Sequence, residues 1–247
     1  SRPVVIGPLL DSVRENVAYS SLFKQSLFCA PCHEGTLLGT PVYTTFSEWN
    51  AWSGNESCQD CHMPPDGPRR HHHAMALQSG KPKGALRAAW SLQATSTGSK
   101  VALTIHADGV GHALPTGHID RHILGWLEVR DATGRQVLSS NDHQALPSWA
   151  TGLQHPAPGF LLARWKQKEH EGPIPFWSPE GEIRDTRLLP GQSRRLEWHL
   201  PPEAGSVRLR IEHRKAWPAM QKAHELSLPA AVLLDETREL LSAASGR

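Results

Sequence analysis

All four cysteines of the chain lie in two five-residue motifs, CAPCH at Cys29–His33 and CQDCH at Cys58–His62. This CxxCH spacing is the attachment signature of a covalently held c-type haem. The two cysteines form thioethers to the vinyl groups of one porphyrin, and the histidine that follows is the proximal ligand of its iron. The sequence therefore predicts two covalent haem c groups per chain, held by Cys29, Cys32 and His33 and by Cys58, Cys61 and His62.

Two other uses of the cysteines are open. Two CxxC pairs can build a structural zinc site with four thiolate ligands, and four cysteines can form two disulfides. The gap between Cys32 and Cys58 is longer than the usual spacing of a zinc ribbon, and such a site has no use for a histidine directly after each pair. The histidines that follow both pairs therefore favour haem.

Charge and hydropathy exclude several classes of partner. The chain has 247 residues, of which 26 are basic and 24 acidic. This balance gives no strong field for binding nucleic acid or a membrane surface, and no segment approaches the roughly 18 to 20 apolar residues of a transmembrane helix. The first six residues look like a processed start. Because haem is attached to CxxCH motifs outside the cytoplasm, we expect a periplasmic or extracellular protein whose export signal has been removed.

The sequence divides into parts of different character. Residues 1–84 contain both CxxCH motifs, many Pro and Gly residues and little periodicity, so haem rather than side-chain packing is expected to organise this dihaem segment. From residue 85, apolar and polar residues alternate, as in half-buried strands. Such alternation is clear at Val101, Leu103 and Ile105 and again at Val207, Leu209 and Ile211. Residues 85–215 are therefore predicted to form a β-sandwich.

Two segments break this alternation. Residues 144–188 are rich in Pro, Trp and Gly and are expected to form a long irregular excursion, a type of loop that is often functional. In the tail, residues 216–247, apolar residues at helical spacings predict a short helix between Leu228 and Ala244. The expected fold is thus mainly β, with a loop-rich dihaem segment packed on a β-sandwich and a short C-terminal helix.

The order of the motifs resembles a family of multihaem c-type cytochromes. In this family a CxxCH is followed by a Glu-Trp pair, here Glu48-Trp49, and then by CxxCHMP, here residues 58–64. The match continues through a His-containing segment at 71–75 into GHALPTG at 111–117, which is similar to the family's GHxxPTG element. The pieces DATG at 131–134 and DTRLLP at 185–190 fit its β-domain. The resemblance implies electron transfer by low-spin haems, with a β-sandwich directly behind the haem segment.

The distal ligands are harder to assign, because thirteen histidines remain after His33 and His62 are set aside. Bis-histidine coordination is the favoured hypothesis, with methionine as the other candidate type of sixth ligand. Within the resemblance, His73 best matches the family's ligand segment, and His112 lies in the GHxxPTG element. These two are the predicted distal ligands. Reserve candidates are the neighbouring histidines, namely His71, His72, His118 and His122.

The leading functional hypothesis is a non-enzymatic electron carrier or conduit. Other redox proteins or cytochromes would be its donor and acceptor, and with only two haems a long conducting path would need a homo-oligomer or a larger assembly. The alternative is a redox enzyme in which one haem keeps an open coordination position and acts on a small nitrogen, sulfur or peroxide species. A third reading makes the sandwich a binding module for a surface or polysaccharide.

Overall fold

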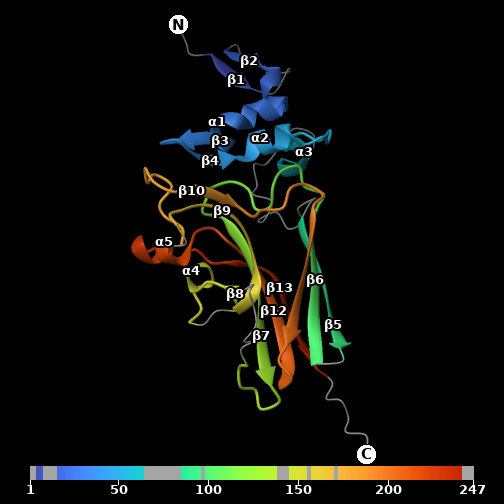
Figure 1. Ribbon diagram of the computed structural model, residues 1–247. Helices are drawn as coiled ribbons and strands as arrows, with labels where there is room; N and C mark the ends of the chain where they lie inside the picture. Colours follow the sequence, from blue (N-terminus) through green and yellow to red (C-terminus); the bar gives the residue numbers. More distant parts are fainter. Residues whose placement is uncertain are drawn as a thin grey trace, which may run out of the picture.

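The computed structural model describes residues 4–7, 16–63, 85–95, 98–137, 145–154, 157–169 and 172–240. The predicted mainly β fold is confirmed, since strands dominate and the helices are short. Figure 1 shows the N-terminal part at one end of two long sheets. In the described residues, no helix is long and apolar enough to cross a membrane.

Two antiparallel sheets form the larger part of the molecule. The first contains, in spatial order, β10 (Glu182–Asp185), β9 (Ala157–Gln167), β7 (His122–Asp131), β12 (Ala204–Arg214) and β13 (Ala231–Glu239), with β8 (Ala145–Leu146) paired to β9. The second contains β11 (Ser193–Leu200), β6 (Gly98–Asp108) and β5 (Ala85–Thr95). The order is not sequential, so chain segments that are far apart in sequence become neighbours.

A single apolar core lies between the two sheets. The alternation predicted at residues 101–105 and 207–211 is confirmed, because all six apolar side chains are buried at 0–1% exposure. They share one core cluster with Trp198 of β11 and Phe160 of β9. Because both sheets contribute their inward faces to this cluster, the arrangement is that of a two-layer β-sandwich.

The expectation of an irregular excursion at 144–188 is wrong for its centre, which forms β9, one of the longest strands. Nearly every residue of β9 is buried, so apolar and polar residues do not alternate along it. One face carries Phe160 and Leu162 into the sandwich core. The opposite face carries Ala163 and Trp165 into an aromatic cluster with Trp217. Burial on both faces therefore removed the signal from which a strand is normally recognised.

The predicted helix between Leu228 and Ala244 is also wrong. The chain there forms β13, which pairs with β12 at the edge of the first sheet. The pairing shifts register at Ile211/Glu212, where Ile211 faces Leu234 and Glu212 faces Val232. The extra residue on β13 interrupts the period of two and leaves apolar residues at spacings that resemble a helix. A short helix of the tail is instead α5 (Pro218–Ala223), which lies close to α4 (Ser148–Thr151).

The N-terminal part is built from short elements. It contains the strand pairs β1 (Val5–Gly7) with β2 (Val17–Tyr19) and β3 (Glu34–Leu37) with β4 (Thr40–Thr44). Its helices are the 3-10 turns η1 (Ser21–Lys24) and η2 (Ser26–Cys29) and the α-helices α1 (Ala30–His33), α2 (Thr45–Asn50) and α3 (Cys58–His62). Strand β9 reaches this part, because Lys166 Nζ donates to Thr40 Oγ1 at 3.2 Å. The sandwich thus extends into the segment that carries both CxxCH motifs.

Candidate haem-binding site

The first CxxCH motif runs from Cys29 at the end of η2 through α1, the second forms α3, and the two motifs lie close together. The backbone N–H of Cys58 donates to Ser26 Oγ at 2.9 Å, and Gln59 Nε2 donates to the carbonyl oxygen of Gln25 at 2.8 Å. Burial, together with the neighbouring Cys58 thiol, raises the pKa of Cys29 to about 11. The first cysteines of the two motifs are therefore neighbours, and groups attached to them would lie close together.

Helix α3 is fixed locally by a capping box. Ser57 Oγ accepts from the backbone N–H of Asp60 at 3.2 Å, and Asp60 Oδ2 accepts from the backbone N–H of Ser57 at 2.8 Å. These reciprocal bonds satisfy two backbone donors that a helix start leaves free. The single turn that they hold carries Cys58, Cys61 and His62.

The described residues include all four cysteines, and no two of them are joined by a disulfide. A zinc site would need the thiolates and further ligands to converge on one point. Within the described ranges, no group of three or more Cys, His, Asp or Glu residues is arranged to hold a metal ion in this way.

The imidazole of His62 faces that of His112, which comes from the loop between β6 and β7. The ring centres are 6.0 Å apart and the ring planes differ by 16°. Two axial imidazoles on one iron have ring centres about 6 Å apart, because each metal–nitrogen bond is about 2 Å and each ring centre lies about 1 Å beyond its nitrogen. The ring-centre spacing of His62 and His112 matches this value.

One nitrogen of the His112 ring is held by the backbone. Its Nδ1 lies 3.1 Å from the carbonyl oxygen of Ala113, so Nε2 is the nitrogen that could coordinate a metal. Ligand histidines commonly hold their second nitrogen in such a bond, which fixes the ring orientation. Burial lowers the pKa of His112, although the Ala113 carbonyl and Glu48 partly offset the effect. The ring is therefore kept in the neutral form that binds a metal.

The structure places the other predicted ligands elsewhere. His118 packs edge-on against Tyr43 and Phe176, with ring centres 5.5 Å away in each case. His122 is fully buried in the sandwich and stacks on Trp217 at 3.9 Å. Residues 71–73, which contain the predicted ligand His73 and the reserves His71 and His72, lie outside the described residues. The structure thus pairs His112 with His62 and gives the reserves His118 and His122 other contacts.

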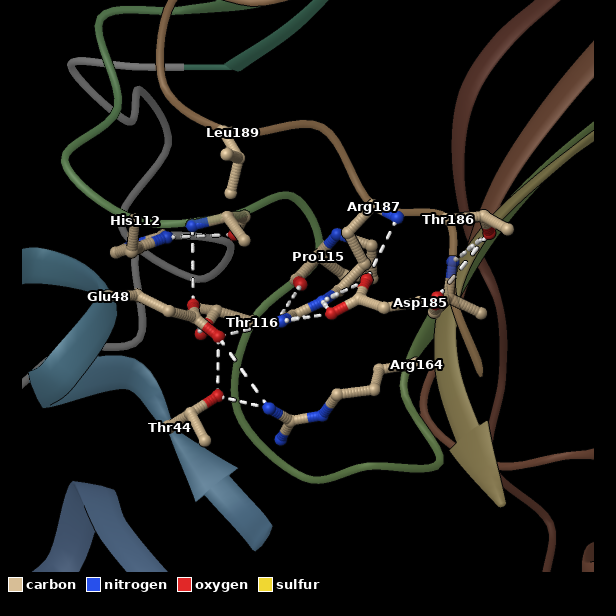
Figure 2. A network of polar contacts seen from close by, with 12 residues as sticks. Thr44, Glu48, His112, Pro115, Thr116, Arg164, Asp185, Thr186, Arg187 and Leu189 are labelled. Carbon is tan, nitrogen blue, oxygen red and sulfur yellow. Dashed lines mark hydrogen bonds and ion pairs between the residues drawn. The ribbon is translucent and has the colours of Figure 1, made fainter. Parts of the chain in front are cut away.

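A buried carboxylate, Glu48 of α2, connects the haem segment to the sandwich (Figure 2). Its Oε1 accepts from Arg187 Nη1 at 2.6 Å, and its Oε2 accepts from Thr116 Oγ1 at 2.8 Å and from the backbone N–H of Ala113 at 3.2 Å. Burial raises the pKa of Glu48, but Arg187 and the hydroxyl donors outweigh this effect and hold the pKa below its usual value. Glu48 is therefore ionised at neutral pH.

The loop that carries His112 is also bonded to the segment before β11. Leu114 and Leu188 exchange two backbone hydrogen bonds, of 2.8 and 3.1 Å. Arg187 Nη1 also lies 3.4 Å from the carbonyl oxygen of Pro115. The loop turns at Gly117, whose φ of +95° lies in the left-handed region that favours glycine. The GHALPTG and DTRLLP motifs, which are far apart in the sequence, are therefore joined directly by hydrogen bonds.

Trp52 holds the same loop from the other side. A Cβ atom added to Gly111 would lie 2.7 Å from a ring carbon of Trp52, and one added to Gly54 would lie 2.0 Å from another. Both glycines therefore permit an approach of backbone to ring that any side chain would prevent. Because Gly111 precedes His112, the indole packs directly beside the candidate ligand.

The described residues of the N-terminal part form little apolar core, which is a further test of the fit to haem. Within the ranges 4–7 and 16–63, Val42 is the one hydrophobic side chain that is buried. Large apolar side chains are instead exposed close to the first CxxCH motif, including Leu22, Leu27 and Phe28. A porphyrin offers a large apolar surface that would cover such side chains. The residues present therefore fit a covalently held haem.

Sequence reasoning missed most of the residues that hold the site together. The sequence places Glu48 in a Glu-Trp pair, but does not indicate that it accepts hydrogen bonds from the His112 loop. Arg164, whose Nη1 lies 3.9 Å from Glu48 Oε1, comes from the strand that was expected to be irregular. The signal that could have found these residues is a charged side chain inside an otherwise apolar or motif-bearing segment.

Comparisons with known proteins agree with this fold. No protein-family model matches the chain, and no curated protein matches it. A solved structure of a penta-heme cytochrome c552 from Thermochromatium tepidum is similar to it, with a TM-score of 0.69 and 20% sequence identity. The match covers 91% of this chain and 58% of that one. The chain therefore shares the fold of a multihaem c-type cytochrome over little more than half of that cytochrome's length.

Proposed function

We propose that this chain is a dihaem c-type cytochrome that transfers electrons. One haem is attached to Cys29 and Cys32 with His33 as its proximal ligand. The other is attached to Cys58 and Cys61 with His62 as its proximal ligand. His112 completes the coordination of the second iron, and His73 is the proposed distal ligand of the first. Bound haem supplies a one-electron couple, and the protein sets its axial ligands and surroundings.

The observation that carries this proposal is the pair formed by His62 and His112. A CxxCH histidine lies beside a second imidazole at a ring-centre spacing close to that of two axial ligands, and this second imidazole belongs to the GHxxPTG-like element. An iron with two imidazole ligands has no open position for a substrate. This arrangement favours electron transfer over catalysis at the second haem.

The proximity of the two motifs supports a path between the haems. Cys29 and Cys58 are close enough for one thiol to influence the other, so two macrocycles tethered there would be near neighbours. We propose other redox proteins as donor and acceptor, and a location outside the cytoplasm, where haem is attached to CxxCH motifs. Because the similar cytochrome is longer and named for five haems, we also propose assembly with other cytochromes for conduction over longer distances.

The test is to produce the protein in a host that attaches haem c and to examine the purified holoprotein. We expect the denatured mass to exceed that of the polypeptide by two haem groups. We expect electron paramagnetic resonance of the oxidised protein to show two low-spin ferric irons with two nitrogen axial ligands each. A mass equal to the bare polypeptide would refute the proposal.

The same sample separates carrier from enzyme. A high-spin ferric component, together with carbon monoxide binding by the ferrous protein, would indicate an open coordination position and would favour a redox enzyme. An open position would be expected first at the iron bound by His33, because the proposed distal ligand of this iron, His73, lies outside the described residues.

A further inference from the structure

We propose that Glu48 is a positioning residue for the iron held by His62, and that it acts through the backbone on either side of the ligand His112. This inference rests on the proposed haem function. Glu48 does not itself touch the iron. It fixes the peptide that orients the distal imidazole.

The contacts form a short chain from the carboxylate to the ring. The backbone N–H of Ala113 donates to Glu48 Oε2 at 3.2 Å, and the carbonyl oxygen of the same residue lies 3.1 Å from His112 Nδ1. A shift of Ala113 would therefore rotate or release the His112 ring. On the other side, Trp52 packs against Gly111. One stretch of the haem segment, residues 48–52, thus holds both neighbours of His112.

The negative charge of Glu48 allows its carboxylate to accept all of these hydrogen bonds at the same time. A carboxylate is purely an acceptor, and Glu48 accepts from Arg187, Thr44, Thr116 and Ala113 together. Its side chain is 11% exposed, so water cannot readily replace a lost partner. Glutamine has nearly the same shape but a single acceptor oxygen, and its amide would present N–H groups to donors. The substitution Glu48→Gln therefore breaks the network without removing volume.

The same network couples iron coordination to the contact between the two parts of the molecule. His62 comes from the N-terminal part, whereas His112 comes from a loop of the sandwich, and Glu48 bridges the two through Arg187 of the sandwich. Within the described residues, the hydrogen bonds of Glu48 reach the His112 loop, Thr44 and Arg187, and none reaches the first CxxCH motif. Loss of its charge should therefore affect one haem of the two.

The experiment compares haem-loaded wild type with Glu48→Gln. We expect both haems to remain attached by mass, half of the haem to become high-spin, and that half to bind carbon monoxide when reduced. Loss of a residue that orients a metal ligand typically weakens binding by about 10–100-fold, so free imidazole should restore the low-spin signal. An unchanged first haem, the one whose proximal ligand is His33, is the signature that distinguishes positioning from general loss of structure.

Two control variants test whether the loss of any other carboxylate charge has the same effect as the loss of Glu48. Glu180→Gln neutralises an exposed carboxylate that pairs with Lys168, away from the His112 loop. Glu197→Gln neutralises an exposed carboxylate on β11 that pairs with Arg195 and Lys100. Both variants should keep two low-spin haems.

The outcomes test the positioning role of Glu48 separately from the proposed haem function. If Glu48→Gln keeps both haems low-spin and unreactive to carbon monoxide, the positioning role is refuted and the proposed function stands. If both haem signals change together, Glu48 is merely structural and the inference is also refuted. If the variant does not accumulate, Thr116→Val removes one donor to Glu48 and should give the same one-haem response at smaller amplitude, and no response would overturn the proposal. A wild-type protein without haem would refute the function itself.

Discussion

Replacement of His112 by alanine is the most direct test of the coordination proposed for the second haem. The ring centre of His112 lies 6.0 Å from that of His62, which leaves room for one iron and its two bonds to nitrogen. The variant retains His62 and both cysteines of the second motif. The expected change is therefore confined to one axial position of one iron.

The fraction of the low-spin signal that should be lost follows from the number of haem irons. One of the two haems loses its sixth ligand, so half of the low-spin ferric signal should convert to high-spin, and half of the ferrous haem should bind carbon monoxide. Because the substitution leaves a ring-sized space beside the iron, added imidazole should restore the low-spin signal. The mass should still show two haems, since the thioether bonds do not depend on the distal ligand.

The assay is electron paramagnetic resonance with a parallel optical titration with carbon monoxide. His118→Ala is the matched control, because His118 lies on the same loop but packs against Tyr43 and Phe176. It should keep both haems low-spin. The reasoning is refuted if His112→Ala remains fully low-spin without added imidazole, or if His118→Ala is the variant that converts.

Two further predictions concern the attachment site and the sandwich core. The double substitution of Cys58 and Cys61 by alanine should remove one haem from the denatured mass and make the N-terminal part susceptible to proteolysis, since that part has little apolar core; an unchanged mass would show that attachment there is wrong. Burial lowers the pKa of His122 to about 3, below its unfolded value of roughly 6.5. The unfolded state therefore binds more protons between these values, and the free energy of unfolding should fall by about 3 kcal/mol from pH 7 to pH 4 on account of this residue. His122→Phe, which keeps an aromatic ring against Trp217, should lessen the pH dependence by this amount in urea unfolding, whereas an unaltered dependence would contradict the assignment.

The sequence by itself determined the fold class and supplied the motifs on which the proposed haem chemistry rests. Covalent attachment needs two cysteines and a histidine at fixed short spacing, so CxxCH can be read without a structure. Strands such as β6 and β12 are half-buried, and their alternation therefore shows directly in the order of residues. His112 could be selected because it lies inside a recognisable motif.

Tertiary structure decided what depends on contacts between distant segments. Strand β9 is covered on both faces, and the bulge in β13 interrupts its alternation. Neither strand therefore shows a regular period of two in the sequence. The buried charge of Glu48 is stabilised by Arg187, which is far away in the sequence, and no spacing rule connects the two. The pairing of His62 with His112 has the same origin, because two parts of the chain must fold against each other before their rings can face one another.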